Sequence, residues 1–290
     1  MNAVKTVSLT KFYGKARGIT DIDLTVAEGD FFGFIGPNGA GKSTTIRILT
    51  GLISQTGGTA EVFGRDIRSK RTEVLADIGY MPSEANFYHG MRVGEVIKYS
   101  ARLRNRDCES EAAKLCERLD LDVSRKISEL SLGNRKKVSI VCALQHSPKL
   151  CILDEPTSGL DPLMQREFYA ILEERNKQGS TIFLSSHILS EIQKYCKRAA
   201  VIREGRLLFC DFVENLVHSN AKKVALSGIS ELPKLNGIAN VETDGDTVKF
   251  LYSGEVHELM KMLASLPITD VSISEPDLEE IFMHFYKESK

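Results

Sequence analysis

The sequence predicts an α/β fold built around a parallel sheet, and three observations support this prediction. A strand-sized apolar run at 30–36 leads through a glycine-rich segment, 36–41, into helical sequence at 43–52. A second apolar run, which begins at residue 149 and is closed by two acids, is typical of a strand buried on both faces. From there to residue 211, strand-like and helix-like segments alternate, which favours the α/β class.

The remaining elements of the N-terminal part follow from the spacing of apolar side chains. Residues 3–13 and 18–32 alternate apolar and polar side chains, which predicts strands with one buried face and an antiparallel β subdomain. From about Glu84 to Ser147 apolar residues recur every three and four positions, which predicts a helical insertion. Further strands are expected at 57–67, 78–82, 180–187 and 198–211, and further helices at 162–179 and 188–197.

The pattern changes past about Leu216, which predicts a second, smaller domain. Strand-like runs at 222–228, 238–254 and 268–274 accompany helical sequence at 255–266 and 277–287. Within them, the stretch "TDGDT" predicts the turn of a hairpin. We therefore expect residues 1–216 to form the main domain and residues 217–290 to form a C-terminal accessory α+β domain.

The glycine-rich segment has the spacing of a phosphate-binding loop, Gly36-x-x-x-x-Gly41-Lys42-Ser43. Glycines allow backbone N–H groups to point inward, and the start of the following helix adds positive potential, so together they form an anion site. Lys42 supplies a charge for the outer phosphates, and Ser43 offers a hydroxyl to Mg²⁺. The alternative is a plain glycine-rich turn. The predicted nucleotide-binding residues here are Gly36, Asn38, Gly39, Ala40, Gly41, Lys42, Ser43 and Thr44.

Two carboxylates follow the apolar run that begins at residue 149. Asp154 would end a strand at the edge of the sheet where the phosphate loop also lies, and it would hold Mg²⁺, through water. Glu155 follows at once and can orient and deprotonate an attacking water molecule. On its own this pattern is also compatible with an ordinary strand end. Behind a phosphate loop it predicts the second half of a P-loop NTPase site.

At this point the motifs resemble those of the ATP-binding subunits of ABC transporters. "GPNGAGKST", "CILDEPTSGLD" and "LSSH" occur in that family's order and spacing over roughly the first 210 residues. The resemblance implies that His187 reaches the γ-phosphate and helps to hold the catalytic water. It also implies that Tyr13 stacks on adenine and that the loop 158–161, with Asp161, contacts an opposing subunit. The alternatives are a surface or core histidine and a core tyrosine.

The family's Ser-Gly-Gly-Gln signature is altered in this chain to "SLGN". Ser131 and Gly133 keep the Ser and second Gly positions, while Leu132 and Asn134 replace the other two residues. By resemblance, Ser131 and the N–H of Gly133 bind the γ-phosphate held by a partner subunit, at a helix N-terminus. The alternative is that Ser131 only caps the helix.

A second departure concerns the residue after "IGYMP", where the family usually has a glutamine that meets Mg²⁺. Here that position is Ser83, and Glu84 follows it. Serine is too short to reach as glutamine does without a water molecule between. We therefore expect either water-mediated Mg²⁺ coordination at Ser83 or substitution by Glu84.

The resemblance implies a subunit that binds ATP and Mg²⁺, hydrolyses ATP and works with a second copy of itself or a related ATPase subunit. It further implies a separate integral membrane permease, gripped near residues 83–92, and a cytoplasmic location, peripheral on the inner face of the membrane. The signature and the tail "EPDLEEIFMHFYK" resemble those of bacterial drug, peptide and antibiotic-resistance exporters. The alternatives are a soluble ABC ATPase acting on DNA or ribosomes, and a nucleotide kinase or GTPase.

Composition adds further expectations. The chain has 290 residues and a net charge of −1, so no global field favours nucleic acid, and we expect no nucleic-acid partner. The basic run Arg135-Lys136-Lys137 is expected to be a solvated helix face. The chain has no apolar run of about 18 residues, which membrane-spanning helices need, and we expect no signal peptide. Its six cysteines form no CxxC pair, so no zinc site is suggested.

Overall fold

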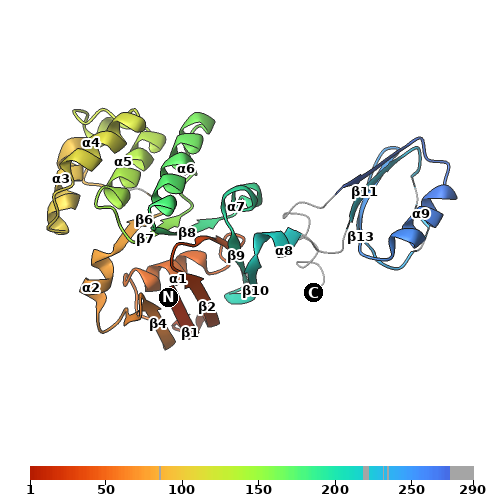
Figure 1. Ribbon diagram of the computed structural model, residues 1–290, viewed down its shortest axis with the longest axis horizontal. Coiled ribbons are helices and arrows are strands. Elements are labelled where there is room, and N and C mark those ends of the chain that lie inside the picture. Colours follow the sequence, from red (N-terminus) through yellow and green to blue (C-terminus); the bar gives the residue numbers. More distant parts are fainter. Residues whose placement is uncertain (85, 218–221, 231, 234, 275–290) are drawn as a thin grey trace. The chain divides into compact units, whose positions relative to one another are not determined.

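The computed structural model describes residues 1–290 except 85, 218–221, 231, 234 and 275–290 (Figure 1). It divides into two compact units, Met1–Cys210 and Asp211–Lys290. The domain boundary expected after residue 216 stays a prediction. Every helix within the described ranges is too short or too polar to cross a lipid bilayer.

A six-stranded sheet in the order β10-β9-β3-β8-β7-β6 forms the centre of the fold. Its strands are β3 (Phe31–Ile35), β6 (Ile78–Met81), β7 (Leu150–Asp154), β8 (Thr181–Ser186), β9 (Arg198–Arg203) and β10 (Arg206–Phe212). Strand β3 is parallel to β8 and β9, and β7 is parallel to β6 and β8. All residues of β3, β7 and β8 are buried, as expected for strands covered on both faces. The carboxyl ends of β3 and β7 therefore lie at the same edge of the sheet.

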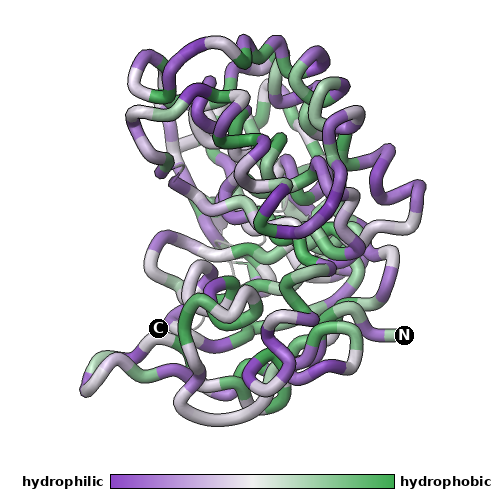
Figure 2. Tube along the Cα trace, turned by 90° about the vertical axis from the view of Figure 1, so that its left-hand side faces the viewer, coloured by the Kyte–Doolittle hydropathy of each residue, from purple (hydrophilic) through white to green (hydrophobic). Residues whose placement is uncertain are grey.

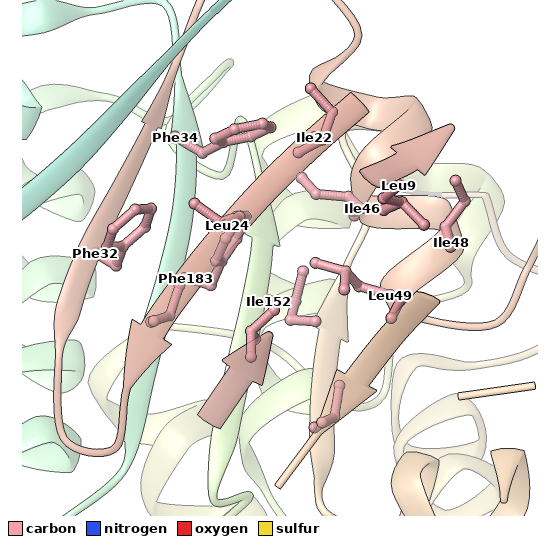
Figure 3. Close-up of a cluster of buried hydrophobic side chains, with 14 of the residues drawn as sticks. Leu9, Ile22, Leu24, Phe32, Phe34, Ile46, Ile48, Leu49, Ile152 and Phe183 are labelled. Carbon is pink, nitrogen blue, oxygen red and sulfur yellow. The ribbon is translucent and has the colours of Figure 1, made fainter. Parts of the chain in front are cut away.

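Helix α1 (Lys42–Leu49) packs between the central sheet and a second sheet in the order β2-β1-β4-β5. The second sheet contains β1 (Asn2–Tyr13), β2 (Ala16–Ala27), β4 (Gly57–Val62) and β5 (Arg65–Asp66), and its paired strands are antiparallel. Figure 3 shows side chains of α1 between the two sheets, with Ile46 and Leu49 in one buried cluster with Leu24 and Ile152. This cluster fixes the helix that starts at the phosphate loop.

The helix predicted to extend to Leu52 is shorter in the structure, so this end of the prediction is wrong. The helix ends at Leu49, and Gly51 adopts a left-handed backbone conformation with φ of 64°. The chain turns there, so the Leu52 side chain is 54% exposed.

The predicted helical insertion contains α3 (Val93–Leu103), α4 (Glu109–Arg118), the short 3₁₀ helix η1 (Ile127–Glu129) and α5 (Leu132–Leu144). Figure 2 shows hydrophobic and hydrophilic residues alternating along these helices, which is typical of amphipathic packing. The helices α6 (Pro162–Lys177) and α7 (Leu189–Tyr195) follow later in the chain. A short helix before β6, α2 (Arg71–Ala76), was not predicted from the sequence.

The basic run at the start of α5 is not a solvated helix face, so that expectation is wrong. Lys136 is 1% exposed and Lys137 is 9% exposed. Helix α5 packs against α3, α4 and β6, which enclose it on several sides. Polar positions of this helix are therefore buried together with the apolar ones.

The second unit contains a four-stranded antiparallel sheet in the order β12-β13-β11-β14 and the helices α8 (Val213–Val217) and α9 (Val256–Ala264). The strands are β11 (Lys222–Ser227), β12 (Ile238–Asp244), β13 (Thr247–Tyr252) and β14 (Asp270–Ser274). The predicted hairpin turn is confirmed, because Gly245, with φ of 59°, lies between β12 and β13. The helix expected at 277–287 lies outside the described residues.

A buried histidine between the central sheet and the helical insertion provides a prediction about stability. His146 is 4% exposed, and its Nε2 lies 3.1 Å from the Ile78 carbonyl oxygen, so Nε2 carries the proton. Burial, followed by the charge of Arg104, lowers the pKa of His146 from 6.5 to about 4. The unfolded chain therefore binds more protons between these values, and stability must fall as the pH drops through that window.

We expect the free energy of unfolding to decrease by up to about 3 kcal/mol between pH 6.5 and 4 because of His146 alone. The measurement is urea unfolding at several pH values for the wild type and for His146→Gln, whose amide can still donate to Ile78. The variant should show a smaller loss on acidification. Parallel pH profiles for the two proteins would contradict the assignment.

Candidate nucleotide site

The loop after β3 has backbone geometry that requires its glycines. Gly39 and Gly41 have φ values of 79° and 112°, which residues with a Cβ atom rarely adopt. A Cβ at Gly36 would lie 2.4 Å from the carbonyl oxygen of Ile202, and one at Gly41 would lie 2.7 Å from a methyl group of Ile19. The loop therefore needs glycine both for its conformation and for its close packing, and it leads directly into α1.

A cavity of about 210 Å³ lies against this loop. It is lined by Tyr13, Arg17, Gly18, Pro37, Asn38, Gly39, Gly41, Lys42, Ser43, Thr44 and Glu155. The structure thus brings together Tyr13, most of the predicted loop residues and Glu155 from distant parts of the chain. Gly36 and Ala40 lie behind the loop surface, and Ala40 is 3% exposed. A larger cavity of about 880 Å³ lies between α3 and α4 and contains none of the predicted site residues.

Lys42 lines the cavity, and its ammonium group has three close oxygen partners. Its Nζ donates to the carbonyl oxygens of Gly36 and Pro37, at 2.6 and 3.3 Å, and lies 3.3 Å from Oε1 of Glu155. The side chain is 5% exposed. A phosphate group that enters this cavity would compete with Glu155 for the ammonium group.

Glu155 connects the lysine to the predicted histidine. Its second carboxylate oxygen, Oε2, lies 3.3 Å from Nδ1 of His187, which is 49% exposed. Its backbone φ is 48°, in the left-handed region. The carboxylate therefore lies between Lys42 and His187, in the wall of the cavity at the phosphate loop.

Asp154 is held by a residue that the sequence analysis did not single out. Oγ of Ser185, on β8, donates to Oδ1 of Asp154 at 2.6 Å, and the Glu155 N–H donates to the Ser185 carbonyl and hydroxyl oxygens at 3.1 and 3.2 Å. The available signal was a polar serine pair at the end of an apolar strand. Asp154 is 2% exposed, and its carboxylate and the hydroxyl of Ser43 are oxygen donors of the kind that Mg²⁺ prefers. These residues therefore fit a magnesium ion.

The residues expected to face a second subunit lie elsewhere. Ser131 Oγ accepts from the Asn134 N–H at 3.3 Å and so caps α5, and Asp161 caps α6 by accepting from two backbone N–H groups at 3.0 Å. A Cβ at Gly133 would lie 2.8 Å from the carbonyl oxygen of Gly159, so the signature lies beside the loop 158–161. Ser131, Gly133, Asp161 and the half-buried Ser83 are not among the described residues that line the cavity.

Arg17 also lines the cavity, although the sequence analysis did not identify it. Its guanidinium lies 3.6 Å from Glu204, and its side chain is 46% exposed. Its position depends on how β2 passes the phosphate loop, and no local pattern in the sequence indicates that.

The fold and this cavity define a P-loop nucleotide-binding protein with a helical insertion, and comparison with known proteins gives the family. The sequence profile described as "ABC transporter" matches residues 19–158. The bacitracin transport ATP-binding protein BcrA of Bacillus licheniformis is 33% identical over 97% of this chain and 96% of its own. The linearmycin resistance ATP-binding protein LnrL of Bacillus subtilis is 28% identical over 96% of each chain.

Solved structures agree in fold. A structure of the ATP binding subunit of an ABC transporter superposes with a TM-score of 0.71 at 27% identity, over 74% of this chain and 91% of that one. A dimeric ATP-binding cassette, MJ0796 with ADP and Pi, gives a TM-score of 0.67 at 23% identity, over 72% and 98%. The chain therefore belongs to the ATP-binding proteins of ABC transporters, and it is an ATPase. The predicted family and fold class are confirmed, and the roles of individual residues stay predictions.

Ser185 provides a test of the Asp154 assignment. Ser185→Ala removes the hydroxyl that donates to the buried Asp154 carboxylate, and hydrogen bonds to charged groups contribute about 1.5–3 kcal/mol. We expect the Mg²⁺ concentration for half-maximal ATPase activity to rise about tenfold or more, because the carboxylate loses its orientation. The measurement is the ATPase rate as a function of Mg²⁺ concentration.

The matched control is Ser186→Ala, because the Ser186 hydroxyl pairs with Glu191 instead. It should leave the Mg²⁺ dependence within about twofold of wild type, because the hydrogen bond from Ser185 to Asp154 is retained. An equal shift in both variants would mean that the effect is not specific to Asp154.

Proposed function

We propose that this chain is the ATP-hydrolysing subunit of a bacterial exporter of antibiotics or related drugs, which it powers through a separate integral membrane permease. The observation that carries the proposal is the Glu155 carboxylate, 3.3 Å from both Lys42 and His187 at the phosphate-loop cavity. The export of antibiotics is supported by BcrA and LnrL, which are named for bacitracin transport and linearmycin resistance and align over nearly the whole chain.

The contacts suggest how the residues work during hydrolysis. The phosphates of ATP take the place of Glu155 beside Lys42, and the loop N–H groups hold them with Tyr13 beneath the adenine. Mg²⁺, held by Ser43 and Asp154, neutralises phosphate charge when it is bound. The released Glu155 carboxylate accepts a proton from a water molecule that attacks the γ-phosphorus, and His187 keeps that water in place. The bond from the γ-phosphorus to the bridging oxygen breaks, which gives ADP and phosphate.

The site of one chain is completed by a second ATPase subunit, either another copy or a related chain. Ser131 and Gly133 lie outside the cavity of their own chain, while the chain has one phosphate loop and one signature. Two chains arranged head to tail would place each signature over the other's nucleotide. ATP then favours the closed pair of subunits, because each γ-phosphate is contacted by both chains. Hydrolysis removes this contact and the pair opens. This change of conformation drives a permease at the cytoplasmic face of the membrane.

Glu155→Gln tests this arrangement. We expect the variant to bind MgATP with about wild-type affinity, because the amide still reaches its neighbours, while kcat falls at least about 100-fold through loss of the base. Light scattering with MgATP should give twice the mass of the nucleotide-free protein. Adding Ser131→Arg, which blocks the signature, should abolish this doubling. A variant that binds ATP and keeps the mass of one chain would overturn the paired site.

The same variant tests the membrane partner. A tagged Glu155→Gln chain, purified from detergent-solubilised native membranes with MgATP, should retain a polytopic membrane protein. Recovery of ribosomes or DNA in place of a membrane protein would favour a soluble ABC ATPase instead.

The altered magnesium position gives a further prediction. Ser83→Gln introduces a side chain long enough to reach Mg²⁺, so we expect a lower Mg²⁺ concentration for half-maximal activity and a higher kcat. If Glu84 substitutes for the glutamine, Glu84→Ala should raise the Mg²⁺ concentration for half-maximal activity. Steady-state ATPase rates measured against Mg²⁺ concentration separate the two cases. If neither substitution changes turnover or Mg²⁺ dependence, the assignment of this segment to the metal fails.

A further inference from the structure

Lys136 is a buried lysine for which the chemistry above has no role. It lies on α5, shortly after the signature residue Ser131, and is 1% exposed. Its Nζ donates to the backbone carbonyl oxygen of Glu155 at 2.9 Å. Burial lowers the pKa of Lys136, while the nearby carboxylates of Asp154 and Glu155 act in the opposite direction. A buried ammonium group needs such partners, so its place next to Glu155 is well defined.

The Lys136 contact falls on a backbone segment that needs support. Glu155 has φ of 48°, a conformation that is unfavourable for residues with a side chain and persists only when neighbours hold it. Its N–H donates to Ser185 on β8, and its carbonyl oxygen accepts from Lys136 on α5. The peptide groups on the two sides of Glu155 are therefore held by two different elements, which together fix the direction of its carboxylate toward Lys42 and His187.

We propose that Lys136 is a positioning residue for Glu155, which holds the Glu155 peptide in its left-handed conformation and so keeps the carboxylate directed at the attacking water. This inference rests on the proposed function, because it assigns Glu155 the role of base. It also links the signature to the proposed base of the same chain, because Ser131 caps the helix that carries Lys136. A purely structural lysine would affect folding and nucleotide binding as much as turnover, and this difference makes the proposal testable.

The experiment uses the full chain and compares Lys136→Met with Lys137→Met. Met keeps the length and the apolar stem of lysine and removes the donor. For Lys136→Met we expect kcat to fall at least tenfold, while KM for MgATP and the Kd for a fluorescent ATP analogue stay within threefold. Lys137→Met removes a charge from the next position of the same helix, where the side chain is also buried, and should leave kcat within twofold.

Lys136→Arg keeps a donor at this position. It provides a second test of the proposal if the Lys136→Met protein does not fold. Its planar head cannot superpose on the ammonium group, so kcat should lie between those of wild type and Lys136→Met, again with an unchanged Kd. Both Lys136 substitutions should have little further effect in the Glu155→Gln background, measured as single-turnover rates, because they act through the same residue.

The outcomes separate this proposal from the proposed function. If Glu155→Gln itself leaves kcat unchanged, the proposed role of Glu155 fails. If Glu155→Gln is inactive but a Lys136 substitution leaves kcat unchanged, weakens ATP binding in proportion to kcat, or multiplies the Glu155→Gln defect, the positioning role of Lys136 is overturned.

Discussion

The contact between Lys42 and Glu155 depends on the register of the parallel sheet. Strand β8 pairs on one side with β3, where Ile35 lies opposite Ser186, and on the other with β7, where Asp154 lies opposite Ser185. This shared strand brings the phosphate loop after β3 to the acids at the end of β7. A slip of one residue would turn every side chain of a strand to the opposite face and would separate the lysine from the carboxylate. The buried apolar side chains of β3, β7 and β8 therefore specify the site as well as the core.

The charged side chains at this edge of the sheet lie close to partners of opposite sign. Lys42 and Lys136 face Glu155 and Asp154, and all four side chains are buried or nearly so. A buried charge needs a partner, so in the proposed site the phosphates of ATP would compete with Glu155 for Lys42. A divalent cation held by Asp154, as proposed above, would compensate the negative charge that the phosphates add. On the proposed assignment, the site would therefore bind ATP and Mg²⁺ together more favourably than either alone.

Sequence patterns predicted those parts of the site that are formed by residues adjacent in the chain. The phosphate loop has a fixed spacing, the strand before Asp154 is continuously apolar, and both follow from adjacent residues. Ser185, Lys136 and Arg17 were missed because their positions depend on which elements pack together. The basic run of α5 was interpreted wrongly for the same reason, since charge alone does not indicate that α3, α4 and β6 enclose that helix. Helix α1 was predicted too long because apolar residues continue at helical spacing past Gly51, where the chain turns.

Three exposed aliphatic residues suggest where a second chain would cover this surface. Leu132 is 54% exposed, Leu163 is 69% exposed and Ile188 is 38% exposed. Leu132 and Leu163 lie within two residues of Ser131 and Asp161, which the family resemblance assigns to contacts with a partner subunit, and Ile188 follows His187, which it assigns to the γ-phosphate. Single exposed apolar side chains are common on protein surfaces, but burial of these three on pairing would add to the phosphate contacts. In that case Leu132, which replaces the first signature glycine, would restrict the backbone of the signature but would add an apolar contact to the second chain. The closed pair would then depend less on the signature N–H groups than a glycine-containing signature does.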